Sequence, residues 1–185
     1  MTIIRTKNLI LRDFEWSDLI SYQALRDEAK FQRFYSESDT SIARAEQLLK
    51  MFIQQSATEP RTKFQLAVVS NQGDLMGSCG VRIESPGQAS VGCELGRRWH
   101  GSGAAREAAQ AIVDFGFKTL GVDRIYAETI SANHAAAALC RSLGMRVESE
   151  RVDDQFFKGK HWSTVVLALL ASEWRARAAQ RLEST

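Results

Sequence analysis

Apolar residues recur along the chain with two spacings, one typical of β-strands and one typical of α-helices. Runs of alternating or continuous apolar residues predict about seven strands, at residues 8–12, 64–69, 75–83, 90–95, 125–130, 146–157 and 164–170. Turn residues separate several of these runs, including Asn71-Gln72-Gly73-Asp74 and Lys158-Gly159-Lys160. The strands at residues 64–69, 75–83 and 90–95 are therefore predicted to form an antiparallel meander, and the last two strands a long hairpin.

Apolar residues at steps of three and four predict helices between these strands. Ser17 can cap a helix over residues 18–26, and Thr40 or Ser41 can begin a second helix with one apolar stripe. The buried side of a shorter, later helix is predicted to comprise Ala135, Leu139 and Leu143. Gly144 can end that helix in a left-handed conformation. The whole pattern predicts an α/β protein in which helices flank a central sheet.

Composition narrows the class of protein. The chain has 185 residues, of which 44% are hydrophobic and 25% charged, so we expect one globular domain over residues 1–185. Lys and Arg number 24 and Asp and Glu 22, a balance that does not indicate a nucleic-acid partner. The N-terminus lacks the apolar core of a signal peptide, and no run approaches the roughly 18 apolar residues of a membrane span. We therefore expect a cytoplasmic protein without a membrane partner.

The cysteines and histidines do not indicate a metal site. Cys79, Cys93 and Cys140 are widely spaced and odd in number, and no C-x-x-C pair occurs. The three histidines have no ligand spacing with them. We therefore predict neither a metal centre nor a disulfide framework.

A glycine-rich turn links the predicted strand at residues 90–95 to a helix that reaches about Leu120. Gly101 and Gly103 permit positive φ and close approach of a ligand, and the free N–H groups of the helix start form an anion site. No Lys follows Gly103, so the turn is not a P-loop, and Arg106 stands where a Rossmann fingerprint needs Gly or Ala. Two interpretations of the turn remain open: a site for a phosphate ligand of another kind, or an ordinary tight turn without a ligand.

The motifs around this turn resemble those of the GNAT acetyltransferases. Arg98-Trp99-His100-Gly101-Ser102-Gly103 fits the R/Q-x-x-G-x-G/A pyrophosphate loop of that family, and Gly92-Cys93-Glu94-Leu95 is similar to its G-Y-E-L strand. Three further segments resemble the RimJ/RimL-like branch: Thr6 to Arg12, Asn133 with Leu143-Gly144-Met145, and Glu173-Trp174. The resemblance covers nearly the whole chain.

This resemblance implies a GNAT fold, with a mixed, mostly antiparallel sheet of about seven strands that is splayed between strands 4 and 5. It implies acetyl-CoA as co-substrate. The residues expected to bind CoA are Leu95, Arg97, Arg98, Trp99, His100, Gly101, Ser102, Gly103, Ala104, Ala105 and Asn133. The backbone amides from Trp99 to Ala105 are expected to be free to bind the pyrophosphate.

The resemblance also implies catalytic roles. Glu94 leads into the thioester site and is the expected general base, directly or through a water; the alternative is a solvent-facing strand residue. The branch often has Ser where Ala136 stands, and other members have Tyr where Cys140 stands. The Cys140 thiol is therefore a candidate general acid, and the alternative is a small buried cysteine. Asn133 is expected both to cap a helix and to contact pantetheine.

The function implied is transfer of acetyl from acetyl-CoA to a primary amine by direct attack. The acceptor is either a protein N-terminus or a small molecule. Phe31, Phe34 and Tyr35 lie in the region that borders the acceptor in the family, although such aromatics can also simply cover the core. One alternative is a CoA-binding sensor or scaffold without catalysis, and another is a different fold for phosphate ligands. The chain is expected to be a monomer or a homodimer.

Overall fold

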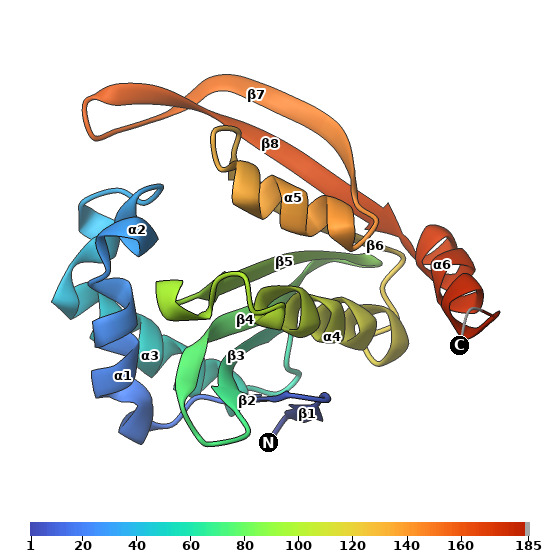
Figure 1. Ribbon diagram of the computed structural model, residues 1–185, viewed down its shortest axis with the longest axis horizontal. Helices are drawn as coiled ribbons and strands as arrows, with labels where there is room; N and C mark the ends of the chain where they lie inside the picture. The colour runs from blue at the N-terminus through green and yellow to red at the C-terminus, as the bar shows by residue number, and fades with distance from the viewer. Residues whose placement is uncertain (184–185) are drawn as a thin grey trace.

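The computed structural model describes residues 1–183, apart from the side chains of residues 30, 31, 42 and 181–183. Within this part of the chain, eight strands form one mixed sheet in the order β1-β2-β3-β4-β5-β6-β8-β7 (Figure 1). The strands are β1 (Ile3–Arg5), β2 (Leu9–Asp13), β3 (Lys63–Ser70), β4 (Leu75–Ser85), β5 (Gln88–Leu95), β6 (Arg124–Ile130), β7 (Arg146–Phe157) and β8 (Lys160–Leu170). Neighbouring strands run antiparallel except for β5 and β6, which run parallel.

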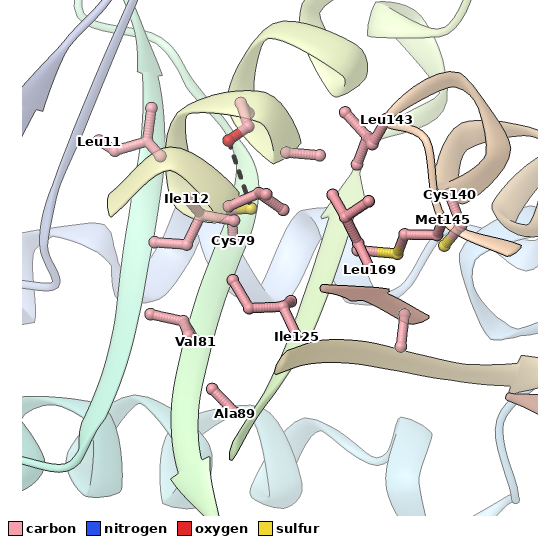
Figure 2. Packing of buried hydrophobic residues seen from close by; sticks show 14 of the residues in the cluster. Leu11, Cys79, Val81, Ala89, Ile112, Ile125, Cys140, Leu143, Met145 and Leu169 are labelled. Atoms are coloured by element: carbon pink, nitrogen blue, oxygen red, sulfur yellow. Dashed lines mark hydrogen bonds between the residues drawn. The ribbon is translucent and has the colours of Figure 1, made fainter. Parts of the chain in front are cut away.

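Helices cover both faces of the sheet. The α-helices are α1 (Leu19–Arg26), α2 (Ala29–Gln32), α3 (Ile42–Ser56), α4 (Ala104–Lys118), α5 (His134–Ser142) and α6 (Ala171–Glu183). Alternation along β3 assigns the faces, because Leu66 and Val68 belong to the main core with α4, whereas Ala67 and Val69 belong to a second core with α3. Figure 2 shows part of the main core, where α4, α5 and the central strands meet.

The second core fixes α1 and α3 on the sheet. The rings of Phe14, Tyr22 and Phe52 pack together, with centroids 5.3 Å apart for Phe14 and Tyr22 and 5.4 Å apart for Phe14 and Phe52. Leu49 lies beneath them and is fully buried. Because Tyr22 belongs to α1, this aromatic cluster sets the position of that helix over β3 and β4.

The β7–β8 hairpin meets the N-terminal helices at its tip (Figure 1). Lys158 Nζ donates to the Gln32 carbonyl at 2.6 Å, and the rings of Phe34 and Trp162 are in edge contact with centroids 5.8 Å apart. Phe157 also stacks on Trp162, with ring centroids 5.1 Å apart. The tip of the β7–β8 hairpin and the segment around residues 32–34, which are remote in sequence, are therefore in direct contact.

The structure corrects four details predicted from the sequence. The strand β1 was not predicted, because three residues are too few to show alternation, and β8 begins at Lys160 rather than at residue 164. Ser17 does not cap α1; a short 3-10 turn with an Asp18–Glu15 capping box precedes the helix. Ala135 is exposed on α5, where the buried residues are Ala137 and Cys140. Residues 135–138 are all alanine, so the sequence does not show which side of this helix is apolar and which is polar.

We expect Phe52→Ala to lower the free energy of unfolding by about 3–5 kcal/mol, because it removes the ring that packs on Phe14 and Tyr22 and leaves a cavity. Met51→Ala, at an exposed neighbouring position of α3, is the matched control and is expected to cost less than about 1 kcal/mol. Urea denaturation measures both. Equal losses would contradict the assignment of Phe52 as the anchor of α3.

Candidate functional site

The parallel strands β5 and β6 separate part of the way along the sheet. In the described part of the chain, their paired residues are Gln88 with Arg124, Ala89 with Ile125, and Ser90 with Tyr126. The pairing of β5 with β4 continues to Leu95 and Gly77. The far halves of β5 and β6 therefore diverge, and the β6-facing backbone groups beyond Ser90 are left for another partner.

The glycine-rich turn after β5 has the backbone geometry of a ligand cradle. Gly101 has φ of 78° and Gly103 φ of 85°, a left-handed conformation that favours glycine. A Cβ at either position would meet nothing within 4 Å, so the turn presents open space. Gly103 is the N-cap of α4, whose first helical hydrogen bond runs from the Glu107 amide to the Gly103 carbonyl.

Several backbone amides of the turn have no protein partner within residues 1–183. They belong to Gly101, Gly103, Ala105 and Arg106. Other amides already donate to carbonyl or hydroxyl oxygens of the turn itself, namely those of Trp99, His100, Ser102 and Ala104. The expectation that all amides from Trp99 to Ala105 are free is therefore wrong for these four. The remaining free N–H groups lie at the positive end of α4 and favour an anion.

Most side chains of the turn make contacts within the protein that hold the turn in its conformation. His100 Nε2 lies 3.0 Å from the Leu95 carbonyl, and the Arg98 guanidinium stacks on Trp99 and pairs with Asp74 at 3.3 Å. Trp99 packs against the main core, to which the buried Leu95 and Ala104 also belong. The structure thus uses these side chains to hold the loop, while the amides remain available to a ligand.

The turn is also tied to α1. The Arg97 amide donates to Glu28 Oε2 at 2.7 Å. A Cβ at Gly96 would lie 2.3 Å from Leu25 Cδ2, so the end of α1 packs directly on the backbone before the turn. The segment after α1 and the glycine turn are therefore in direct contact.

A cavity of about 420 Å³ lies where β5 and β6 diverge. Its walls come from β3, β4, β5, β6, α4, α5 and the α1–α3 region, and include Tyr22, Arg26, Tyr35, Gln65, Arg82, Cys93, Glu94, Thr129, Asn133, Ala136 and Cys140. The cavity therefore brings together four residues proposed from the sequence: Tyr35, Glu94, Asn133 and Cys140. It also includes Tyr22 and Arg26, one helical turn apart on α1, which the sequence analysis missed.

Glu94 lies in this cavity among hydrogen-bond donors. Tyr35 Oη donates to Glu94 Oε2 at 2.7 Å, and Ser78 Oγ donates to Glu94 Oε1 at 3.0 Å. The Arg26 guanidinium is 3.7 Å from Glu94 Oε1. Arg26 itself is 4% exposed. The Glu94 side chain is therefore half-buried and hydrogen-bonded, while 23% of it stays exposed.

Two titratable groups of the cavity are shifted by their surroundings. The negative charge of Glu94, followed by burial, raises the pKa of Tyr35 well above its usual value, so the phenol stays protonated and remains a donor. Burial raises the pKa of Cys140 to about 11, so its thiol is also protonated at neutral pH. Cys140 lies at the α5 end of the core (Figure 2).

The remaining candidates are placed differently. Asn133 Oδ1 caps α5 by accepting from the Ala136 amide at 3.3 Å, and the residue also lines the cavity. Phe34 packs on Trp162 at the hairpin tip. The side chain of Phe31 lies outside the described residues.

Comparison with known proteins identifies the family. A model of the acetyltransferase (GNAT) domain matches residues 8–146. The chain belongs to the GNAT acetyltransferase family. The curated protein called "Uncharacterized N-acetyltransferase p20", from Bacillus licheniformis, is 28% identical over 179 residues, which cover 94% of this chain and 99% of p20. This GNAT chain is therefore an acetyl-CoA-dependent N-acetyltransferase.

Solved structures share the fold at low identity. The RimL ribosomal L7/L12 alpha-N-protein acetyltransferase, in complex with coenzyme A, matches with a TM-score of 0.80 and 16% identity over 91% of this chain and 98% of RimL. Spermidine N-acetyltransferase from Vibrio cholerae, in complex with CoA and spermine, matches with a TM-score of 0.78 and 21% identity over 92% and 99% of the two chains. The GNAT fold is thus confirmed, and the RimJ/RimL-like branch stays a prediction.

Two absences concern only the described part of the chain. Within it, no helix is long and apolar enough to span a bilayer. Likewise, residues 1–183 contain no group of three or more His, Cys, Asp or Glu residues arranged to hold a metal ion.

We expect Gly103→Val to weaken CoA binding at least about tenfold, because the side chain forces the free amides of the turn out of position. Gly121→Val is a matched control, since Gly121 also has positive φ and open space but lies after the far end of α4. Calorimetric titration with CoA and thermal unfolding measure affinity and stability. If Gly103→Val and Gly121→Val lost similar stability and bound CoA with similar affinity, the turn would have only a structural role.

Proposed function

We propose that this GNAT enzyme transfers acetyl from acetyl-CoA directly to a primary amine, of a protein N-terminus or of a small molecule, with Glu94 as general base. The observation that carries this proposal is the position of Glu94 in the wall of the cavity at the β5–β6 divergence. A carboxylate there is held by two hydroxyl donors, faces the Arg26 guanidinium and still lines open space. It can therefore accept a proton from an amine in the cavity.

The donor site is proposed to lie along β5 and the turn. Acetyl-CoA supplies a thioester carbon that is open to attack by an amine. The free amides of Gly101, Gly103, Ala105 and Arg106 would hold the pyrophosphate, and the unpaired backbone beyond Ser90 would hold the pantetheine arm. Of the residues proposed from the sequence, Leu95, Arg97, Arg98, Trp99, His100, Ser102 and Ala104 shape this path, and Asn133 borders it from α5.

The acceptor amine must lose a proton before or during attack, because an ammonium has no lone pair. Glu94 is the carboxylate proposed to accept it, directly or through a water. Tyr35 shapes the same end of the cavity and is proposed to contact the acceptor. Phe34 supports this region through its contact with Trp162, and Phe31 is kept as a sequence-based proposal.

The acceptor class is tested by an amine panel. Spermidine N(1)-acetyltransferase of Escherichia coli is 27% identical over 78 residues, 42% of each chain, and RimL shares the fold, so both polyamines and N-terminal peptides belong in the panel. Thiol release from acetyl-CoA is the readout. Turnover on one class identifies the acceptor. Tight CoA binding without turnover on any amine would instead support a non-catalytic CoA-binding module.

We expect Glu94→Gln to lower kcat/KM by about 10²–10⁴-fold, the usual contribution of a general base, and to abolish the acidic limb of its pH profile. The KM for acetyl-CoA is expected to change little, because the turn is untouched. Glu128→Gln is the control, since Glu128 lines the same cavity but is paired with Arg151 at 2.9 Å. An unchanged acidic limb in Glu94→Gln would remove Glu94 from the base role.

We expect Cys140→Ala to slow turnover less than about tenfold. A thiol with a pKa of about 11 is a weaker acid than an ordinary thiol of about 8.5, so proton transfer from it to a CoA thiolate is uphill. Single-turnover rates with and without the thiol measure its contribution. A loss of more than about 10²-fold at unchanged thermal stability would establish Cys140 as an essential acid instead.

A further inference from the structure

We propose that Gln65, Ser78 and Arg82 form a one-way hydrogen-bond relay that positions Glu94. The relay rests on the proposed role of Glu94 as general base. Its members are positioning residues on β3 and β4, and the sequence analysis assigned none of them. The chain of contacts runs across three neighbouring strands to Glu94 on β5.

The relay consists of three consecutive hydrogen bonds. The Arg82 guanidinium donates to Gln65 Oε1 at 3.3 Å, and Gln65 Nε2 donates to Ser78 Oγ at 3.0 Å. Ser78 Oγ then donates to Glu94 Oε1 at 3.0 Å. Ser78 is fully buried and lies directly opposite Glu94 in the β4–β5 register. Its hydroxyl is therefore shielded from water that would compete for the bond.

Donor and acceptor chemistry gives the relay one direction. A guanidinium has no acceptor, so Arg82 requires the oxygen of the Gln65 amide to face it. The amide NH₂ must then face Ser78. Because Ser78 Oγ accepts from Gln65 and has a single proton, that proton is committed to Glu94. The Arg82 cation, three hydrogen bonds from Glu94, thus favours the same direction that the ionised carboxylate requires of the Ser78 hydroxyl.

Gly80 gives Gln65 the room it needs. Gly80 lies opposite Gln65 in the β3–β4 register, between Ser78 and Arg82 on the same face of β4. A Cβ at Gly80 would lie 2.4 Å from Gln65 Oε1 and 2.8 Å from the Phe64 carbonyl. The missing side chain therefore lets the Gln65 amide lie across β4 and reach both of its partners.

The relay distinguishes the two oxygens of Glu94. Ser78 donates to Oε1, which also lies 3.7 Å from the Arg26 guanidinium, whereas Tyr35 donates to Oε2. A proton on Oε1 would confront the committed hydroxyl of Ser78 and the guanidinium of Arg26. Oε2 also has a committed donor, because the Tyr35 phenol stays protonated. The carboxylate plane is therefore fixed by a hydroxyl on each oxygen.

The test compares pH profiles of kcat/KM for the full chain. Ser78→Ala removes the donor to Oε1, which stabilises the ionised carboxylate, so the acidic limb is expected to move to higher pH by about one unit. Gln65→Glu keeps the size of the side chain but replaces the donating NH₂ by an acceptor, so the Ser78 proton is drawn away from Glu94. Its acidic limb is expected to move in the same direction. The KM for acetyl-CoA is expected to stay constant in both.

Two matched controls separate the relay from general effects. Ser90→Ala removes another serine-to-carboxylate hydrogen bond on the same sheet, the one to Glu84. Gln88→Glu introduces the same change at a glutamine that also accepts from an arginine, Arg124, but feeds no relay. Ser90→Ala and Gln88→Glu are both expected to keep the acidic limb of kcat/KM at its wild-type position. Ser78→Thr, which retains the hydroxyl, is expected to restore most of the profile lost in Ser78→Ala.

The outcomes distinguish this inference from the proposed function. If Glu94→Gln keeps the acidic limb, the base assignment itself fails. If the limb depends on Glu94 but both Ser78→Ala and Gln65→Glu leave it in place, only the relay is overturned. Gln65→Glu is also made in the Ser78→Ala background, where the relay predicts a smaller shift than in the wild type. Equal shifts in both backgrounds would indicate a direct charge effect and would overturn the relay as well.

Discussion

The separation of β5 from β6 is the constraint on which the rest of the molecule depends. Because these strands run parallel and pair only near their starts, β5 is held along its length by β4 alone. The β4 pairing preserves the alternation of β5, which directs Glu94 to one face and packs Cys93 and Leu95 against the core on the other. One irregularity thus provides the cavity, the free backbone edge and the direction of the Glu94 carboxylate, the proposed general base.

Charge inside the cavity is balanced by partners that belong to other elements. Arg26 from α1 faces Glu94 from β5, and at the exposed edge of the cavity Glu128 from β6 accepts two hydrogen bonds from Arg151 of β7. The charge of Arg26 is buried, and a buried charge is costly unless it has such a partner. Each pair joins two separate segments, so the same contacts that balance the charges also hold those segments together.

Much of the architecture could be predicted from the sequence, because strand alternation, turn residues and the glycine motif are local signals. The contacts inside the site could not. Tyr35 and Glu94 are separated by 59 residues, and the Gln65–Ser78 bond depends on the exact register of β3 and β4. A single-residue slip would turn Ser78 to the opposite face. Even within one helix, a run of alanines concealed which side of α5 is buried.

The contact between α1 and the glycine turn links two parts of the candidate site. Glu28 accepts from the Arg97 amide, and Leu25 packs on Gly96, so the wall proposed to meet the acceptor cannot shift without disturbing the backbone that leads to the glycine turn, the proposed donor site. Donor and acceptor affinities should consequently be linked. Thermodynamic reciprocity requires that whatever acetyl-CoA does to the affinity for amine, the amine does equally to the affinity for acetyl-CoA.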